Sequence, residues 1–190
     1  MFLINDLIAL LAANLILTQA LGTSTLFIAA GSRKNLIGTA CTITLFTTAG
    51  SAAAYFTDRN LPEKYADYTL LIYTLSVGIL YVLLLSALYF LKRDKFAEAR
   101  KYIHISAFNC AVMGTLFTVS RRASEDDLPM KLGSYIGAGF EAGIGFIIAA
   151  VILTAAYRKL NSVKVPSSFR GFPAMLIYLG IISMAVYALR

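Results

Sequence analysis

Three side chains inside long apolar stretches belong to residue types that could do chemistry: the thiols of Cys41 and Cys110 and the carboxyl group of Glu141. A thiolate is a soft ligand for iron, although a buried thiol is more often a small core residue. A carboxyl group within a membrane costs free energy and often marks an ion or proton path. The alternative is that Glu141 is a structural partner of His104 or of a polar group on a neighbouring subunit. A disulfide is not expected, because disulfide frameworks belong to small secreted domains.

The composition of the chain is that of a membrane protein. Its 190 residues are 58% hydrophobic and only 14% charged, whereas a soluble domain of this size needs a more charged surface. The net charge of +7 comes from lysines and arginines in the short segments between apolar runs, so nucleic-acid binding is excluded. The chain carries no glycine-rich phosphate loop, and its start lacks the basic region of a cleavable signal peptide, so the first apolar run is expected to be retained.

The apolar runs predict an all-α integral membrane protein with a single domain, residues 1–190, and six transmembrane helices. The expected spans run from Phe2 to about Ala30, Asn35 to Phe56, Tyr68 to Leu91, Tyr102 to Val119, Leu132 to Ala156 and Gly171 to Leu189. At 1.5 Å per residue the first span would make a helix of about 43 Å, which exceeds the bilayer core and predicts a tilted or broken helix.

Polar residues predict that the first and fourth spans are interrupted. The first contains Asn14, Gln19, Gly22, Thr23, Ser24 and Thr25, and the fourth contains His104, Ser106, Asn109, Cys110 and Gly114. Irregular backbone at mid-membrane depth is tolerated only where protein or a cavity covers it. These two spans are therefore the ones expected to line a site.

The distribution of basic residues predicts the orientation in the membrane. The loops after the first, third and fifth spans carry 11 lysines and arginines, and the other side carries 6. Because lysine and arginine accumulate in cytoplasmic loops, both termini are expected to lie outside the cytoplasm.

Three spans precede the most basic loop and three follow it, which predicts two inverted three-helix repeats, residues 1–91 and 102–190. The first span of one half contains Leu21-Gly22-Thr23-Ser24-Thr25-Leu26-Phe27, and the first span of the other contains Met113-Gly114-Thr115-Leu116-Phe117. Inverted repeats with broken helices can build a site at the centre of the membrane. Ordinary helix packing through glycine and threonine is the alternative explanation of this similarity.

Four stretches carry a resemblance to a known family. The stretch Phe108-Asn109-Cys110-Ala111-Val112-Met113-Gly114 resembles the Thr-Asn-Cys-Ala-Val-Leu-Gly signature of the RnfA/NqrE family. Residues 137–146 are similar to the glycine-spaced Tyr-Gly-Phe…Val-Gly-Phe segment of that family, and residues 165–171 to its Val-Pro-x-x-Phe-Arg-Gly. Asn14 with Leu21-Gly22-Thr23-Ser24 resembles its Asn…Leu-Gly-x-Cys. The resemblance covers nearly the whole chain, and the phenylalanine at position 169 favours the RnfA type.

This resemblance implies one component of an Rnf-type, redox-driven complex that exports Na⁺ or H⁺ across the inner membrane while electrons pass from ferredoxin to NAD. It implies a close partner of the RnfE/NqrD type in the opposite orientation, together with flavin-bearing subunits. In the family each partner supplies two cysteines to a [2Fe–2S] cluster at the midplane of the pair. The chain itself is expected to be non-catalytic, as one part of a translocating oxidoreductase.

Carried over to this chain, the resemblance makes Cys110 a cluster ligand and places Ser24 at the position of the second cysteine. A serine hydroxyl is a poor iron ligand, because it is hard and rarely deprotonated. Three possibilities remain open. The cluster is held by three thiolates together with Ser24 or another group, or Cys41 contributes a ligand, or the chain has lost the cluster and kept the scaffold. Glu141 is the candidate for the ion path. A cofactor-free scaffold within such a complex and a stand-alone transporter are the alternative functions.

Overall fold

The computed structural model describes residues 14–91, 96–125 and 128–188, and these residues form helices joined by turns and loops. The chain is therefore all-α over this part, as expected. The helices are α2 (Leu15–Gln19), α3 (Thr23–Ala30), α4 (Arg33–Asn60), the 3₁₀ helix η1 (Glu63–Tyr68), α5 (Thr69–Leu91), α6 (Phe96–Ala107), α7 (Cys110–Ser124), α8 (Leu132–Leu160) and α9 (Phe172–Tyr187).

Within this part of the chain, three helices are long and apolar enough to cross a membrane, and they correspond to the second, third and fifth expected spans: α4, α5 and α8. The pair α6 and α7, bent by 48° at its break, makes a fourth span when the two helices are taken together as one broken span. Helix α9 is apolar but only 16 residues long. The expected first span is described from residue 14 onward, and its residues 2–13 lie outside the described residues. The number of six spans thus stays a prediction.

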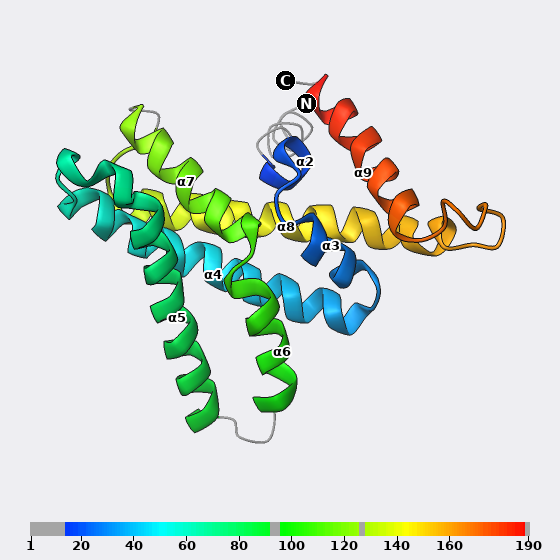
Figure 1. Ribbon diagram of the computed structural model, residues 1–190, viewed down its shortest axis with the longest axis horizontal. Coiled ribbons are helices and arrows are strands. Elements are labelled where there is room, and N and C mark those ends of the chain that lie inside the picture. Colours follow the sequence, from blue (N-terminus) through cyan, green and yellow to red (C-terminus); the bar gives the residue numbers. More distant parts are fainter. Residues whose placement is uncertain (1–13, 92–95, 126–127, 189–190) are drawn as a thin grey trace.

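Helices α4 and α8 lie side by side through the middle of the molecule (Figure 1). Their close approach depends on glycines of α8. A Cβ added to Gly139 would lie 2.5 Å from the carbonyl oxygen of Thr47, and one added to Gly143 would lie 2.6 Å from Cγ2 of Thr44. Small residues allow two helix backbones to approach in this way, so this glycine face serves helix packing.

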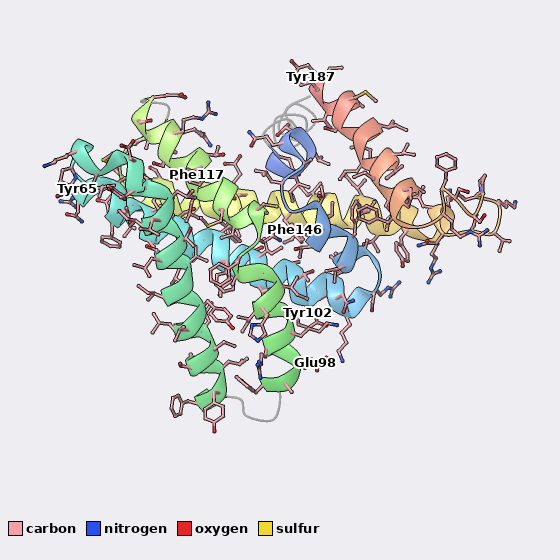
Figure 2. All side chains as sticks on the ribbon, in the orientation of Figure 1. Tyr65, Glu98, Tyr102, Phe117, Phe146 and Tyr187 are labelled. Carbon is pink, nitrogen blue, oxygen red and sulfur yellow. The ribbon has the colours of Figure 1, made fainter. Side chains whose placement is uncertain are left out.

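Two hydrophobic clusters surround the central pair. One gathers Leu17, Leu26 and Phe146 with side chains of α9, and Phe146 lies at the centre of the molecule in Figure 2. The other gathers Phe46 and Leu116 with side chains of α5 and α6. The outward faces of α5 and α9 remain apolar and exposed, as helices that face lipid require.

Polar contacts fix α6 against α4. The hydroxyls of Thr42 and Ser106 lie 2.7 Å apart. The ring of Tyr102 covers Gly38, where an added Cβ would lie 2.7 Å from the ring (Figure 2). These contacts hold the start of the interrupted fourth span on the central helix pair.

Candidate functional site

The first helix interruption separates α2 from α3. Asn14 caps α2, since its Oδ1 accepts the N–H groups of Ile16 and Leu17. Its Nδ2 donates to the carbonyl oxygen of Gly145 at 2.8 Å, near the middle of α8. The chain then turns through Ala20 and Gly22, both with positive φ, at 55° and 78°. Left-handed backbone ends α2 and lets α3 begin in a new direction.

The second interruption separates α6 from α7 at Phe108 and Asn109. Asn109 is the N-cap of α7, and its Oδ1 accepts the N–H group of Ala111 at 2.9 Å. A short polar residue at this position satisfies a backbone donor that the break would leave without a partner. Cys110 therefore becomes the first residue of a new helix.

The two interruptions, which the polar residues of both spans predicted, lie against each other. The N–H group of Gly22 donates to the Sγ atom of Cys110 at 3.0 Å. The Nδ2 group of Asn109 donates to the hydroxyl of Thr25 at 2.6 Å. A Cβ added to Gly22 would lie 2.7 Å from the Cβ of Ala111, so the backbones touch here. We call this contact of Gly22 and Thr25 with Asn109, Cys110 and Ala111 the junction.

The ends of two helices meet at the junction, and both are N-terminal ends: α3 starts after its N-cap Gly22, and α7 after Asn109. Helix N-termini carry a partial positive charge and free N–H groups, which stabilise a negative charge nearby. The junction is therefore a polar site that favours a bound anionic group. Figure 1 shows that the chain runs through α2 and α3 and through α6 and α7 in opposite senses, but the internal repeat itself stays a prediction.

Of the two residues expected at the cofactor site, the structure places Cys110 in this junction and Ser24 beside it in the chain. Cys110 is the first residue of α7, and Ser24 lies in the first turn of α3, two positions after Gly22. Both side chains are exposed on the surface of the protein.

The donor groups at the junction fit only part of the [2Fe–2S] cluster that the resemblance implies. Iron–sulfur clusters are held by thiolates, usually four in number. Among the described residues no group of three or more His, Cys, Asp or Glu could hold a metal ion. In the junction this chain offers one thiol, that of Cys110, and beside it in the chain the hard hydroxyl of Ser24. The residues fit one ligand of such a cluster rather than a pair.

Cys41 lies elsewhere, on the surface of α4, as a free and exposed thiol. It borders two apolar grooves. One, of about 520 Å³, lies between α4 and α8 and includes Phe140; the other, of about 470 Å³, lies between α4, α5 and α6 and includes Tyr102. Neither groove is lined by a residue of the junction, and the role of Cys41 stays open.

Glu141 lies on the exposed face of α8, between the two glycines that pack on α4. Within the described part of the chain it makes no hydrogen bond or ion pair. His104 bonds elsewhere: its Nδ1 lies 2.6 Å from the hydroxyl of Tyr81, and its Nε2 accepts from Nε of Arg100 at 2.8 Å. The alternative explanation that Glu141 is the structural partner of His104 is therefore wrong within this chain.

One polar cluster is not evident from the sequence. Asp58, near the end of α4, accepts hydrogen bonds from the buried tyrosines Tyr73 and Tyr135. In the sequence Asp58 is only one of several acids close to a loop, and nothing in the spacing of the two tyrosines indicates a shared partner. The capping role of Asn109, by contrast, could have been predicted from the sequence, because asparagine directly before a helix is a common N-cap.

The chain is similar to known membrane proteins along nearly its whole length. Residues 5–190 match the family model described as "Rnf-Nqr subunit, membrane protein". An RnfA-type relative, from the ion-translocating oxidoreductase complex of Alcanivorax borkumensis, is 26% identical over 93% of this chain and 90% of its own length. Its counterpart from Shewanella amazonensis is 24% identical over 92% of this chain and 89% of its own length. An NqrE-type relative, from the Na(+)-translocating NADH-quinone reductase of Neisseria meningitidis serogroup C, is 27% identical over 63% and 59%.

Proposed function

This chain belongs to the Rnf-Nqr family of membrane-protein subunits, and from that premise we propose that it is a membrane component of an ion-translocating oxidoreductase complex of the Rnf type. It carries no enzyme site of its own in this proposal. It provides the part of the membrane domain through which electron transfer and ion movement are coupled. The family match and the names of the relatives support the assignment to such a complex.

The observation that carries the proposal is the junction. Two interrupted helices from opposite halves of the sequence touch where the N–H of Gly22 meets the sulfur of Cys110. Asn14 anchors the first interruption near the middle of α8, a helix long enough to span a membrane. A redox centre at such a depth could pass electrons between the two faces of the membrane.

In this proposal Cys110 supplies one thiolate to a [2Fe–2S] cluster shared with a related protein of the RnfE/NqrD type in the opposite orientation. When bound, the cluster would supply one-electron transfer. The N–H of Gly22 and the N-terminus of α7 would stabilise the negative charge of the Cys110 thiolate. Ser24, in the position of the family's second cysteine, would contribute a hydroxyl at most.

The rest of the complex follows from the same assignment. Flavin-bearing subunits and the subunits that handle ferredoxin and NAD are partners in this proposal, and the ion is Na⁺ or H⁺. The membrane is the bacterial inner membrane, with both termini outside the cytoplasm. Glu141 is the candidate for the ion path, because an exposed carboxyl group in an apolar span costs several kcal/mol unless it has a function or a partner.

The serine at position 24 favours a second candidate function, a cofactor-free scaffold within the same kind of complex. The helix interruptions and the junction would then survive as architecture. Iron content separates the two functions, because the scaffold requires none in this part of the membrane domain.

The test uses the complex purified anaerobically from native membranes. Cys110→Ala should lower the iron content and the visible absorbance of the membrane domain and slow electron transfer, while the subunits still co-purify. The matched control is Cys41→Ala, which removes the other thiol and should leave the signals unchanged. An unchanged signal in Cys110→Ala removes this residue from the cluster, and a membrane domain without iron in the wild type supports the scaffold.

A further inference from the structure

Asp58 connects three helices at one end of the molecule. It belongs to the last turn of α4, and its carboxylate accepts the hydroxyl of Tyr73, from α5. Its Oδ2 accepts the hydroxyl of Tyr135, from α8, at 2.8 Å. Both tyrosine side chains are fully buried, at 0% exposure, so the position of the carboxylate is fixed by packing as well as by hydrogen bonds.

A cavity of about 340 Å³ opens beside this carboxylate. Oxygen-bearing side chains make up much of its lining, from Asp58, Thr69, Ser120, Ser124 and Tyr135. Its lining residues come from the part of the fold where α4 and α7 end and where α5 and α8 begin. These helix ends lie at the left of Figure 1. In the expected topology this is the side opposite the cytoplasm. It is far more polar than the grooves beside Cys41.

The carboxylate has capacity left for a positively charged partner. An ionised aspartate offers about four lone-pair sites, and the two tyrosines use two of them. Neither ion pair in the described part of the chain includes Asp58. Two nearby arginines have other partners. Nη1 of Arg59 donates to the hydroxyl of Tyr55 at 3.0 Å, and Nη1 of Arg121 lies 3.7 Å from Oε1 of Glu125.

The chemistry of this cavity selects the class of ligand. Carboxylate and hydroxyl oxygens are hard donors, which prefer small hard cations to soft metals. A single carboxylate balances one positive charge, whereas protein sites for Ca²⁺ commonly use more than one carboxylate. We propose that Asp58, with the hydroxyls of Ser120 and Ser124, binds Na⁺ at the outer end of the bundle. This site deepens the proposed function and rests on it, as the place where a translocated ion leaves or enters.

Helix α7 connects this cavity with the junction. It begins at Cys110 and ends at Ser124, a distance of about 21 Å along the helix axis. Its Phe117, labelled in Figure 2, packs on the ring of Tyr73 with 5.6 Å between ring centroids, and Tyr73 in turn bonds to Asp58. One rigid helix thus extends from the proposed electron-transfer region to the proposed ion site.

The test is equilibrium binding of radioactive Na⁺ to the complex purified from native membranes. Asp58→Asn should weaken binding by about tenfold or more, since the charge is lost while the shape is kept. The matched control is Asp67→Asn, an exposed acid of η1 outside the cavity, which should bind as the wild type does. Ser120→Ala keeps the carboxylate and the hydrogen bonds that it accepts from both tyrosines, while it removes the hydroxyl that bonds to Tyr73. It should weaken binding by about threefold.

The outcomes are separable. Wild-type binding in both Asp58→Asn and Ser120→Ala, or an equal loss in Asp67→Asn, overturns the site. Should Asp58→Asn not assemble, Ser120→Ala decides the question alone. If the complex drives ion transport but Na⁺ binding does not depend on these residues, the site is wrong and the proposed function stands. If Na⁺ binding depends on them but the complex transfers no electrons, the proposed function is wrong and the site stands.

Discussion

The backbone N–H of Gly22 lies 3.0 Å from the sulfur of Cys110, although 88 residues separate them in the chain. This hydrogen bond joins the interruptions of two helices that come from different halves of the sequence. It makes the position of the thiol depend on the backbone of a distant turn. Changes on either side of this contact should therefore affect both interruptions.

Gly22→Ala should lower the free energy of unfolding by about 2 kcal/mol or more. Two causes combine: the residue has a φ of 78°, and its new Cβ would lie 2.7 Å from the Cβ of Ala111. Thermal unfolding of the purified protein in detergent measures the effect. Gly133→Ala is the control, because a Cβ there meets no atom within 4 Å. Equal melting temperatures for the two variants would show that the junction is not closely packed.

Asn109→Ala should cost about 1 kcal/mol through loss of the cap of α7, with a further loss from its bond to Thr25. The double-mutant cycle with Thr25→Val isolates that bond, and a coupling of about 0.5–1.5 kcal/mol is expected. Titration with a denaturing detergent provides the free energies. Strict additivity of the two changes would mean that the contact between the interruptions contributes nothing.

Gly143→Ala should destabilise the pairing of α4 and α8 by about 1–3 kcal/mol, because the new Cβ would lie 2.6 Å from the side chain of Thr44. Gly137→Ala is the matched change on the open face of the same helix and should be neutral or slightly stabilising, since alanine favours helix over glycine. Thermal unfolding compares the two. A larger effect at position 137 would indicate that this face is covered by another protein in the complex.

Glu141→Gln should reduce ion transport severalfold if Glu141 belongs to the ion path, while the amount of assembled complex stays constant. The reason is that glutamine keeps the size and hydrogen-bonding groups of the side chain but cannot carry the charge. Reconstituted vesicles with a fluorescent ion indicator measure transport. Glu125→Gln, an exposed acid after α7, is the control. Transport at the wild-type rate in Glu141→Gln would exclude the residue from the path.

A reporter enzyme that is active only outside the cytoplasm should be active when fused after residue 190 and inactive when inserted in the loop at residues 161–170. The excess of lysine and arginine in the loops after the first, third and fifth spans is the reason. Enzyme activity in whole cells provides the measurement. The reverse pattern would place the Asp58 cavity on the cytoplasmic side and the termini inside.

Much of the architecture could be predicted from residue types alone. Long apolar runs predicted the spans now seen as α4, α5 and α8, because a membrane-crossing helix must be about 20 apolar residues long. The polar residues around Gly22 and Asn109 predicted breaks, and both breaks are present. The resemblance to the RnfA/NqrE family is confirmed by a match over residues 5–190. Helix ends were less predictable: α4 reaches Asn60 and α8 reaches Leu160, one turn beyond the apolar runs.

The sequence by itself determined the membrane setting, the helical class, the interruptions and the family, since each depends on local hydrophobicity, backbone preference or a contiguous motif. Only the tertiary structure decided which groups meet: the thiol of Cys110 with the backbone of Gly22, and the carboxylate of Asp58 with Tyr73 and Tyr135. Such contacts depend on how helices cross and rotate against one another. Glycine faces and side-chain volumes set those angles collectively, and no single segment encodes them.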